Sequence, residues 1–342
     1  MNRKRRIMRA YDCSQRLSMQ NKGYRDRLAD FFGREVFEDM TGTGPRTERK
    51  DLAGSLLFKN SEKSEACMIA KQEGILAGVE EVAWFYKINR LEVEVYKNDG
   101  EKVKPGDKVM RVNGPTCHIL NLERTGLNLV QRMSGIATAV RNLKAKLNGH
   151  KTVIVATRKT MDRYLDKKAV TLGGGLAHRL GLYDGIIVKD NYLTALENSG
   201  KDPIKEAIEL ASMMILDKKL KFIEIEVSSK KDAITAARGF RKAMADINEA
   251  KMAGKASCKE VNPDDFVPCL IMLDNMTPKE AREVVKSLKE EKLHDYVILE
   301  ASGGITDKNA RRYAEAGIDA ISIGAVTHSV KALDLSQKIL KE

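Results

Sequence analysis

Aromatic residues, prolines and paired cysteines are scarce in this chain. Aromatic side chains make up 5% of its 342 residues, with one tryptophan and 7 prolines. The five cysteines show no CxxC pair and no metal-ligand spacing, which argues against a disulfide-stapled scaffold and a structural zinc site. No apolar run approaches the roughly 20 residues that span a bilayer, and no apolar core follows the basic residues at 3–9, as a secretion signal requires. We therefore expect a cytoplasmic protein with reduced thiols and no membrane partner.

Hydrophobic and charged residues are present in the proportions of a globular protein. Hydrophobic residues make up 42% and charged residues 32%, and the length suggests roughly two domains of about 150 residues each. Lysine and arginine outnumber aspartate and glutamate by 60 to 48, a formal net charge of +12. This balance favours a multiply anionic small-molecule ligand or weak attraction to polyanions. Because the cations beyond the N-terminal tail are dispersed, we expect no nucleic-acid partner.

The first half of the chain carries mixed patterns. Residues 1–20 are interpreted as a mobile basic extension. Residues 91–95 alternate with period two and precede an Asn-Asp-Gly turn, which predicts a strand and a hairpin. Over residues 116–145 apolar side chains recur at steps of three and four, which predicts a long helix. Gly126 and a later Ser-Gly pair weaken that helix and could break it.

From residue 150 onward, short apolar runs alternate with longer helix-like stretches. This rhythm predicts parallel strands joined by right-handed crossovers, and six or seven such units favour a (β/α) barrel or a close relative. The competing doubly wound sheet would place a glycine-rich phosphate turn after its first strand, and none is seen there. The stretch between 228 and 269 is long for one crossover and predicts a helix plus a surface insertion, with a loop around 262–265. The expected strands are 153–156, 185–188, 222–227, 270–273, 297–299 and 320–323, with a weaker candidate at 169–172.

Each clear strand ends in polar residues or glycine, and the carboxyl ends of barrel strands form the rim where active sites lie. Arginine binds carboxylates bidentately and lysine supplies a point charge, so a set of cations at this rim predicts a substrate with several negative charges. Any one of these cations alone is explained by a surface salt bridge, and only the set favours a site. Its members are Arg158, Lys159, His178, Arg179 and Lys189.

Two carboxylates and several small residues complete the predicted rim. Glu226 and Asp274 end neighbouring strands and could hold Mg²⁺, or could pair with the nearby cations. Glu224 shares the strand face of Glu226, so the pattern does not choose between them. Backbone N–H groups after the last two strands could cradle a phosphate, although a glycine pair alone is usually only a tight turn. These small residues are Ser302, Gly303, Gly304 and Gly324.

Eight motifs occur in an order that resembles the quinolinate phosphoribosyltransferase family. The resemblance covers about residues 70 to 340 and rests on the whole series, because any single motif would be weak. The motifs are Glu123-Arg124-Thr125 with Gln131 and 134–138, Thr157-Arg158-Lys159-Thr160, Gly173-Gly174-Gly175 with His178-Arg179-Leu180-Gly181-Leu182, Val188-Lys189-Asp190-Asn191, Glu224-Ile225-Glu226-Val227, Leu273-Asp274-Asn275, Glu300-Ala301-Ser302-Gly303-Gly304-Ile305 and Ser322-Ile323-Gly324-Ala325.

The resemblance implies an architecture and an assembly. An N-terminal α/β sandwich domain with a linking helix would occupy residues 21–149, and an open (β/α) barrel of about seven strands would occupy 150–325. The spacing from Glu226 to Asp274 is longer than the family pattern, which implies an insertion near 240–265. Residues 326–342 would form a C-terminal helix that packs back on the N-terminal domain. The chain would form a homodimer or a dimer-based hexamer, in which Arg124 reaches the neighbouring subunit's site.

The resemblance also implies a reaction and a role for each rim residue. The reaction is Mg²⁺-dependent transfer of phosphoribose from phosphoribosyl pyrophosphate to quinolinate with decarboxylation, giving nicotinate mononucleotide, pyrophosphate and CO₂ in de novo NAD biosynthesis. Lys159, Glu226 and Asp274 would be catalytic, and the two carboxylates would bind the metal. Thr157 would also bind substrate. The quinolinate pocket would contain Arg158, Lys159, His178, Arg179 and Lys189, and the 5-phosphate site would contain Ser302, Gly303, Gly304 and Gly324.

Other functions stay open from the sequence. A related phosphoribosyltransferase could act on nicotinate or another aromatic acid, although Arg158 and Arg179 together favour a diacid. A pterin- or molybdenum-associated relative of the same fold is a further option. A barrel aldolase could form a Schiff base on Lys159 or Lys189. A noncatalytic polyanion-binding protein would bind nucleic acid with steep salt dependence and would need no such rim.

Overall fold

The computed structural model describes residues 2–41, 51–59, 61–197, 200–252 and 266–341. These residues form two compact units, and each unit is built from three separate stretches of chain. Unit 1 comprises Met1–Cys13, Leu143–Lys159 and Leu176–Ala325, and unit 2 comprises Ser14–Asn142, Thr160–Gly175 and Val326–Glu342.

Unit 1 is built around a parallel six-stranded sheet with the order β6-β11-β10-β9-β8-β7. Each connection between strands that follow one another along the chain contains at least one helix, as parallel pairing requires. Since β6 and β7 are the two ends of the order, the barrel is open, and the predicted fold class is confirmed. The strands are β6 (Val153–Val155), β7 (Ile186–Val188), β8 (Ile223–Val227), β9 (Cys269–Asp274), β10 (Ile298–Ser302) and β11 (Ala320–Ser322).

The sheet has six strands rather than about seven, because the weaker strand candidate at 169–172 lies in the helix α6 (Arg163–Leu172) of unit 2. Asp162 caps this helix by accepting a hydrogen bond from the Leu165 N–H at 3.1 Å. Leu165 and Ala169, four residues apart, are both buried, so one helical face is covered. The prediction of a strand there is wrong, because the helical period extends beyond the short apolar run on which it rested.

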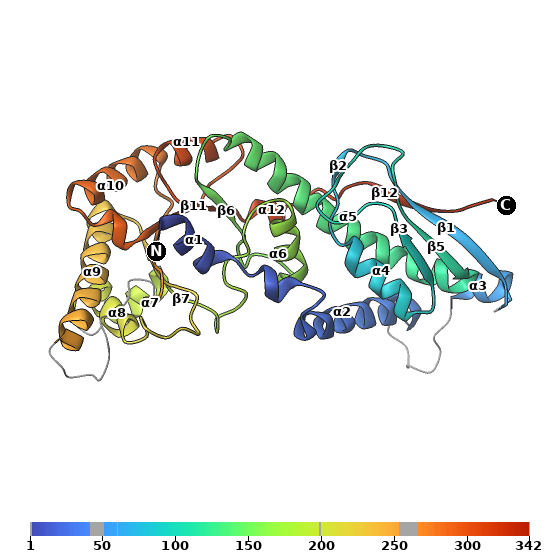
Figure 1. The fold of residues 1–342 in the computed structure, drawn as a ribbon, viewed down its shortest axis with the longest axis horizontal. Helices are drawn as coiled ribbons and strands as arrows, with labels where there is room; N and C mark the ends of the chain where they lie inside the picture. The colour runs from blue at the N-terminus through green and yellow to red at the C-terminus, as the bar shows by residue number, and fades with distance from the viewer. Residues whose placement is uncertain (1, 42–50, 60, 198–199, 253–265, 342) are drawn as a thin grey trace. The chain divides into compact units, whose positions relative to one another are not determined.

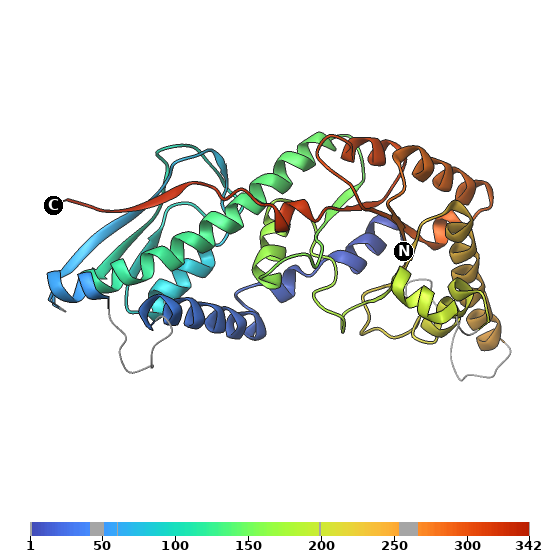
Figure 2. The ribbon, with the colours of Figure 1, turned by 180° about the vertical axis from the view of Figure 1, so that it is seen from behind.

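Helices cover the outer side of the unit 1 strands. Figures 1 and 2 show α9, α10 and α11 along that side. Of the insertion predicted near 240–265, the part up to Met252 continues α9, and the loop expected around 262–265 lies outside the described residues. The helices of unit 1 are α1 (Arg3–Tyr11), α7 (Asp190–Leu196), α8 (Pro203–Ser212), α9 (Lys230–Met252), α10 (Pro278–Glu290) and α11 (Ala310–Glu315), with a 3₁₀ turn at His294–Tyr296.

The prediction that residues 1–20 form a mobile tail is wrong. Residues 3–11 form α1, and Ile7, Ala10 and Tyr11 lie on one face of it at helical spacing. All three side chains are buried in the core of unit 1, together with core residues of β6, β9, β10 and β11. The hydrophobic face of α1 therefore anchors a segment whose high arginine content had predicted exposure to solvent.

The arginines of α1 are paired rather than free in solvent. Arg3 makes a bidentate salt bridge to Asp319, with both N–O distances at 2.5 Å. Arg6 donates from Nη2 to the Tyr296 carbonyl at 2.8 Å. These contacts fix the polar side of α1 to the rest of unit 1, because Arg3 and Arg6 both donate to acceptors there.

Unit 2 contains an antiparallel sheet with the order β12-β1-β5-β3 and a separate β2-β4 pair. The strand predicted at 91–95 is confirmed as β3. The predicted C-terminal helix at 326–342 is wrong in type, because after the short α12 (Ala325–His328) the chain forms β12, which pairs antiparallel with β1. The strands are β1 (Lys63–Ala70), β2 (Gly74–Ile75), β3 (Glu92–Val95), β4 (Lys102–Val103), β5 (Lys108–Pro115) and β12 (Leu335–Ile339).

The long helix predicted at 116–145 is confirmed as α5 (Thr116–Lys146), and its glycines do not break it. A Cβ on Gly126 would lie 2.4 Å from the Tyr86 hydroxyl oxygen, and one on Gly135 would lie 2.3 Å from the Lys331 carbonyl oxygen. These glycines thus allow close packing against the helix. The other helices of unit 2 are α2 (Lys22–Thr41), α3 (Leu52–Leu57) and α4 (Val79–Ile88), besides α6, with a 3₁₀ turn at Ser14–Leu17.

Two sequence-based expectations concern the surroundings of the chain. Within the described ranges, no helix combines the length and the apolar character needed to cross a membrane. None of the four cysteines that the structure describes is in a disulfide. The cytoplasmic location stays a prediction.

Candidate active site

The residues predicted to form the rim lie mainly at one edge of the unit 1 sheet. Asp274 and Ser302 are the last residues of β9 and β10, and they lie opposite each other in the strand register. Lys189 directly follows β7. Because the six strands are parallel, their carboxyl ends meet at this edge. Residues that follow the other strands are Thr157, Arg158 and Lys159 after β6, Gly303 and Gly304 after β10, and Gly324 after β11.

Acidic side chains continue from this edge toward the middle of the sheet. Glu226 lies opposite Met272 in the register, and Met272 lies opposite Glu300 on its other side. Glu224 is two residues before Glu226 and shares its face. All three glutamate side chains are buried. Because little water screens them, each interacts strongly with the charged groups that face it.

Lys189 and Glu226 form an ion pair at the mouth of the site. Lys189 Nζ donates to Glu226 Oε2 at 2.9 Å, and the lysine side chain is 48% exposed against 8% for the glutamate. Burial acts to lower the pKa of Lys189, but the hydrogen bond and charge of Glu226, with the charge of Asp274, raise it above its usual value. A Schiff base needs a neutral amine, so this pairing disfavours the aldolase reading for Lys189.

Arg179 and Arg158 bring two positive charges to the same region. Arg179 is buried, and its Nη1 donates to the Gly185 carbonyl at 2.8 Å. Burial lowers the pKa of Arg179, and the positive charge of Arg158 lowers it further. Arginine nonetheless stays charged in proteins, so the two guanidinium groups repel each other. An anion bound to both would remove that repulsion.

The neighbours of Arg158 are held less firmly. Arg158 and Lys159 are exposed, and Thr157 is partly buried. Thr157 Oγ1 accepts a hydrogen bond from the Lys159 N–H at 3.1 Å. This local turn directs the backbone after β6, at the edge where Arg158 and Lys159 are exposed.

The turn after β10 brings two backbone segments unusually close together. Gly303 and Gly304 have φ of 84° and 59°, a region that favours glycine. A Cβ on Gly303 would lie 2.1 Å from Asn275 Oδ1. The Asn275 N–H donates to the Ser302 carbonyl at 2.9 Å, and Asn275 Nδ2 donates to Asp274 Oδ2 at 2.6 Å. Asp274 is therefore oriented by the same turn that is a candidate phosphate cradle.

His178 lies in the interior of unit 1 rather than at the open edge. Its side chain is buried, and the Arg179 N–H donates to Nδ1 at 2.8 Å. Nδ1 therefore acts as an acceptor, and Nε2 carries the ring proton. Nε2 is 3.2 Å from Glu300 Oε2 and 3.6 Å from Glu224 Oε2. The ring of His178 thus joins the Arg179 backbone to two buried carboxyl groups.

The pKa values of the two carboxyl groups beside His178 are shifted in opposite directions. Burial, followed by the negative charge of Glu300, raises the pKa of Glu224 well above its usual range. Burial also acts to raise the pKa of Glu300, but its interactions with His178 and the hydrogen bond from Tyr11 lower it below the usual value. The Tyr11 hydroxyl donates to Glu300 Oε2 at 2.7 Å. Glu300 is therefore the more acidic of the two carboxyl groups that flank the imidazole.

Sequence reasoning gave no role to Tyr11 or Glu300. Glu300 lies within one of the matched motifs, and its position after a buried strand run was the available signal. Tyr11 belongs to the segment interpreted as mobile, and the spacing of Ile7, Ala10 and Tyr11 was the signal for a buried helix face.

The two residues predicted to bind a metal have side chains whose donor atoms suit a metal ion. Glu226 and Asp274 provide hard oxygen ligands near the edge, and the charges of both act on Lys189. Two carboxylates completed by substrate oxygens and water suit Mg²⁺. The pair therefore fits that ion.

Two tighter clusters of possible ligands are explained without a metal. His178, Glu224 and Glu300 form one cluster, which the hydrogen bonds described above connect. The other consists of Glu80, Glu81 and Asp99 in unit 2. There Lys168 Nζ contacts Glu80 Oε2 at 2.9 Å and also pairs with Glu81, so the lysine supplies the positive charge.

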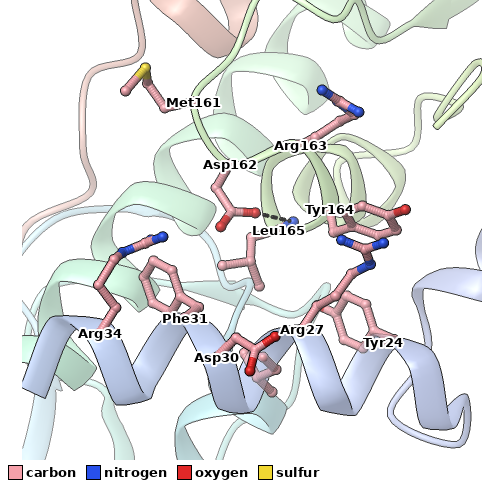
Figure 3. A pocket seen from close by; sticks show the side chains of 11 residues that line it. Tyr24, Arg27, Asp30, Phe31, Arg34, Met161, Asp162, Arg163, Tyr164 and Leu165 are labelled. Atoms are coloured by element: carbon pink, nitrogen blue, oxygen red, sulfur yellow. Dashed lines mark hydrogen bonds between the residues drawn. The ribbon is translucent and has the colours of Figure 1, made fainter. Parts of the chain in front are cut away.

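Unit 2 contains a cavity of about 300 Å³ between α2 and the first residues of α6 (Figure 3). The Arg27 guanidinium lies over the Tyr164 ring, 4.3 Å from its centroid. None of the predicted rim residues lines this cavity. Its charged lining residues are Arg27, Asp30, Arg34, Asp162 and Arg163. Arg124, the remaining predicted site residue, is exposed on α5 of unit 2.

The parallel sheet and the charged residues at the carboxyl ends of its strands together define a class of protein. This class is an α/β barrel protein with a cationic site for acidic substrates. Residues 51–134 match the N-terminal domain of quinolinate phosphoribosyl transferase, and residues 136–338 match its C-terminal domain. The chain belongs to the quinolinate phosphoribosyltransferase family, which confirms the resemblance read from the motifs.

Individual relatives agree with this assignment. A probable nicotinate-nucleotide pyrophosphorylase (carboxylating) from Archaeoglobus fulgidus is 37% identical over 281 residues, which cover 81% of this chain and 95% of that protein. One from Bacillus subtilis is 33% identical over 307 residues, covering 89% and 90%. The solved structure of nicotinate-nucleotide pyrophosphorylase from Francisella tularensis superimposes with a TM-score of 0.70 at 27% identity, covering 92% and 96%.

Proposed function

We propose that this protein transfers phosphoribose from phosphoribosyl pyrophosphate to quinolinate and releases CO₂, giving nicotinate mononucleotide and pyrophosphate for NAD biosynthesis. Family membership supports the reaction class. The observation that carries the proposal is the convergence of Arg158, Arg179 and Lys189 with Glu226 and Asp274 at one edge of the unit 1 sheet. A substrate pair with two carboxylates, a phosphate and a pyrophosphate accounts for so many cations in one place.

Substrate binding follows from the chemistry of these groups. Arg158 and Arg179 bind the two carboxylates of quinolinate, because a guanidinium fork matches a carboxylate and a bound dianion relieves the repulsion between the arginines. The Ser302–Gly304 turn and Gly324 bind the 5-phosphate through backbone N–H groups. Holding the two reactants together supplies a large part of the acceleration.

The bond changes of the reaction assign roles to the remaining residues. The bond between ribose C1 and the pyrophosphate oxygen breaks, and the quinolinate nitrogen forms a bond to C1. Glu226 and Asp274 stabilise the positive charge on the ribose, and Lys159 and Lys189 stabilise the negative charge on the leaving group. The pyridinium then accepts the electron pair as the C–C bond to the adjacent carboxylate breaks, CO₂ leaves, and the ring carbon takes a proton from water.

We also propose that Mg²⁺ is required and that Glu226 and Asp274 hold it. When bound, the ion would offset the charge of the pyrophosphate and orient it. The ion pair between Lys189 and Glu226, at 2.9 Å, holds the Glu226 carboxylate near the edge.

The proposed assembly is a homodimer or a dimer-based hexamer in which Arg124 reaches the neighbouring site. Its support is the family resemblance together with the exposure of Arg124 on α5. A cation supplied by a second subunit would add to the positive charge that an acidic substrate meets.

The experiment that tests the function is incubation of the purified protein with quinolinate, phosphoribosyl pyrophosphate and MgCl₂. We expect nicotinate mononucleotide and CO₂ in equal amounts, and no product when EDTA removes the metal. A parallel reaction with nicotinate in place of quinolinate tests the related transferase. A folded protein that forms no nicotinate mononucleotide from quinolinate, or that prefers nicotinate, would contradict the proposal.

A further inference from the structure

The last residue of α1, Tyr11, and Cys13 just beyond the helix hold the backbone of His178 on both sides. The His178 N–H donates to the Tyr11 carbonyl at 3.0 Å, and Cys13 Sγ donates to the His178 carbonyl at 3.1 Å. His178 has a φ of 58°, in the left-handed region that few residues with a side chain adopt. Such a conformation persists only where the surroundings impose it. Part of that restraint comes from the first thirteen residues of the chain.

Tyr11 also holds the side chain of His178. The two rings have centroids 5.0 Å apart with a tilt of 49°. The Tyr11 hydroxyl and His178 Nε2 both approach the same oxygen of Glu300, at 2.7 Å and 3.2 Å. Tyr11 therefore acts on His178 through its backbone carbonyl, its ring and its hydroxyl.

The restraint continues from His178 to the candidate substrate site. The Arg179 N–H donates to His178 Nδ1 at 2.8 Å. A turn of the imidazole away from Glu300 would take this acceptor from Arg179 and release its backbone. The Arg179 guanidinium is held by the Gly185 carbonyl at 2.8 Å. Because the guanidinium is only a few bonds away from the Arg179 backbone, a shift of that backbone changes the direction in which the guanidinium points.

We propose that Tyr11 is a positioning residue for the acid-binding part of the active site and that it acts through Glu300 and His178 on Arg179. The identity of the acid as quinolinate rests on the proposed function. In this arrangement Tyr11 contacts neither substrate nor reacting atoms, and the N-terminal helix is a working part of the site. The path passes through Glu300 in β10, two residues before Ser302, but it ends at Arg179. We therefore expect the larger effect on the diacid.

The test compares two tyrosine substitutions with the same local chemistry. Tyr11→Phe removes only the hydroxyl that bonds Glu300. Tyr24→Phe is the matched control, because Tyr24 is equally buried and donates to the buried Glu81 at 2.8 Å in unit 2. We expect Tyr11→Phe to raise KM for quinolinate about ten-fold, the effect of one lost hydrogen bond to a charged group, while KM for phosphoribosyl pyrophosphate changes less than about two-fold.

Tyr24→Phe is expected to change neither KM. If Tyr11→Phe leaves KM for quinolinate unchanged, or raises both constants by the same factor, the positioning role is wrong. The split between the two substrates matters because general loss of stability would lower the amount of active enzyme without separating the two KM values.

A second measurement does not depend on activity. In protein labelled with ¹⁵N-histidine and assigned by triple-resonance experiments, we expect the His178 Nδ1 resonance to show an accepted hydrogen bond, as its contact with the Arg179 N–H requires. Tyr11→Phe should shift the His178 Nε2 resonance, and Tyr24→Phe should not. A resonance that is unchanged in Tyr11→Phe would overturn the proposal. If the wild-type protein makes no nicotinate mononucleotide, the proposed function fails, whereas this spectrum still decides the role of Tyr11.

Discussion

At the scale of single residues, burial is uneven among the cations of the site. Arg179 is buried and anchored to a carbonyl, whereas Arg158 and Lys159 are exposed. The type and order of these residues could be predicted because Arg158 and Lys159 follow a strand and all three lie within the matched motifs. The contact of Tyr11 with Glu300 could not, because it joins positions 289 apart, and only the folded barrel brings them together.

Removal of Arg179 is expected to weaken diacid binding. Arg179→Ala deletes a buried guanidinium, and we expect KM for quinolinate to rise at least about ten-fold, since a charge-assisted hydrogen bond contributes about 1.5–3 kcal/mol. KM for phosphoribosyl pyrophosphate should change less. Steady-state kinetics with each substrate varied in turn measures both. Arg238→Ala is the control, because Arg238 pairs with Glu291 at the surface, and equal effects of the two variants would contradict the assignment.

Removal of Asp274 is expected to act on turnover and on the metal. Asp274→Ala should lower kcat by about 10²-fold or more, the scale of a lost electrostatic contact to the transition state, and should raise the Mg²⁺ concentration needed for half-maximal rate. A titration of rate against MgCl₂ measures this. Asp307→Ala, which removes an exposed partner of Lys146, should leave the titration unchanged. A normal Mg²⁺ curve for Asp274→Ala would remove this residue from the proposed metal site.

At the scale of elements, periodicity predicted α5 correctly because its buried positions repeat every three or four residues. The glycines of α5 suggested a break that the structure does not show. Helix propensity records only the cost of glycine in a helix and not the tertiary packing that offsets this cost. The same limit applies to 169–172 and to 326–342. A short apolar run fits a helix or a strand equally well, and the pairing of β12 with β1, which decides the second case, depends on residues far earlier in the chain.

Two glycine substitutions separate propensity from packing. Gly126→Ala should destabilise unit 2 by about 1–3 kcal/mol, because the added methyl group would overlap the Tyr86 hydroxyl. Gly33→Ala, in α2 with nothing within 4 Å of the new Cβ, should stabilise by about 0.5–1 kcal/mol. Urea unfolding followed by circular dichroism gives both values. Two shifts of the same sign would show that packing at Gly126 is not the deciding factor.

At the scale of the whole molecule, each unit is assembled from three stretches of chain. Sequence patterns predicted two regions divided near residue 150, because composition and rhythm change there. They could not show that residues 1–13 belong with the parallel sheet, or that 160–175 belong with the antiparallel one. That exchange depends on contacts between distant parts of the chain, which no local pattern records.

The proposed sharing of Arg124 between subunits has a clear test. Arg124→Ala and Asp274→Ala should each be nearly inactive alone. If Arg124 serves the neighbouring site, mixing the two variants and allowing subunit exchange should restore activity at roughly a quarter of the sites, because mixed dimers contain one intact site. Recovery is measured against wild-type protein taken through the same exchange. No recovery between variants that exchange subunits would assign Arg124 to its own chain.

The burial of α1 has a consequence for biosynthesis. The helix is translated long before β10 and β11, whose core residues help to bury Ile7, Ala10 and Tyr11. For most of its synthesis the nascent protein therefore carries an arginine-rich amphipathic peptide with no place to dock. A bulky group attached next to α1 would then compete with the late docking of this helix onto the sheet.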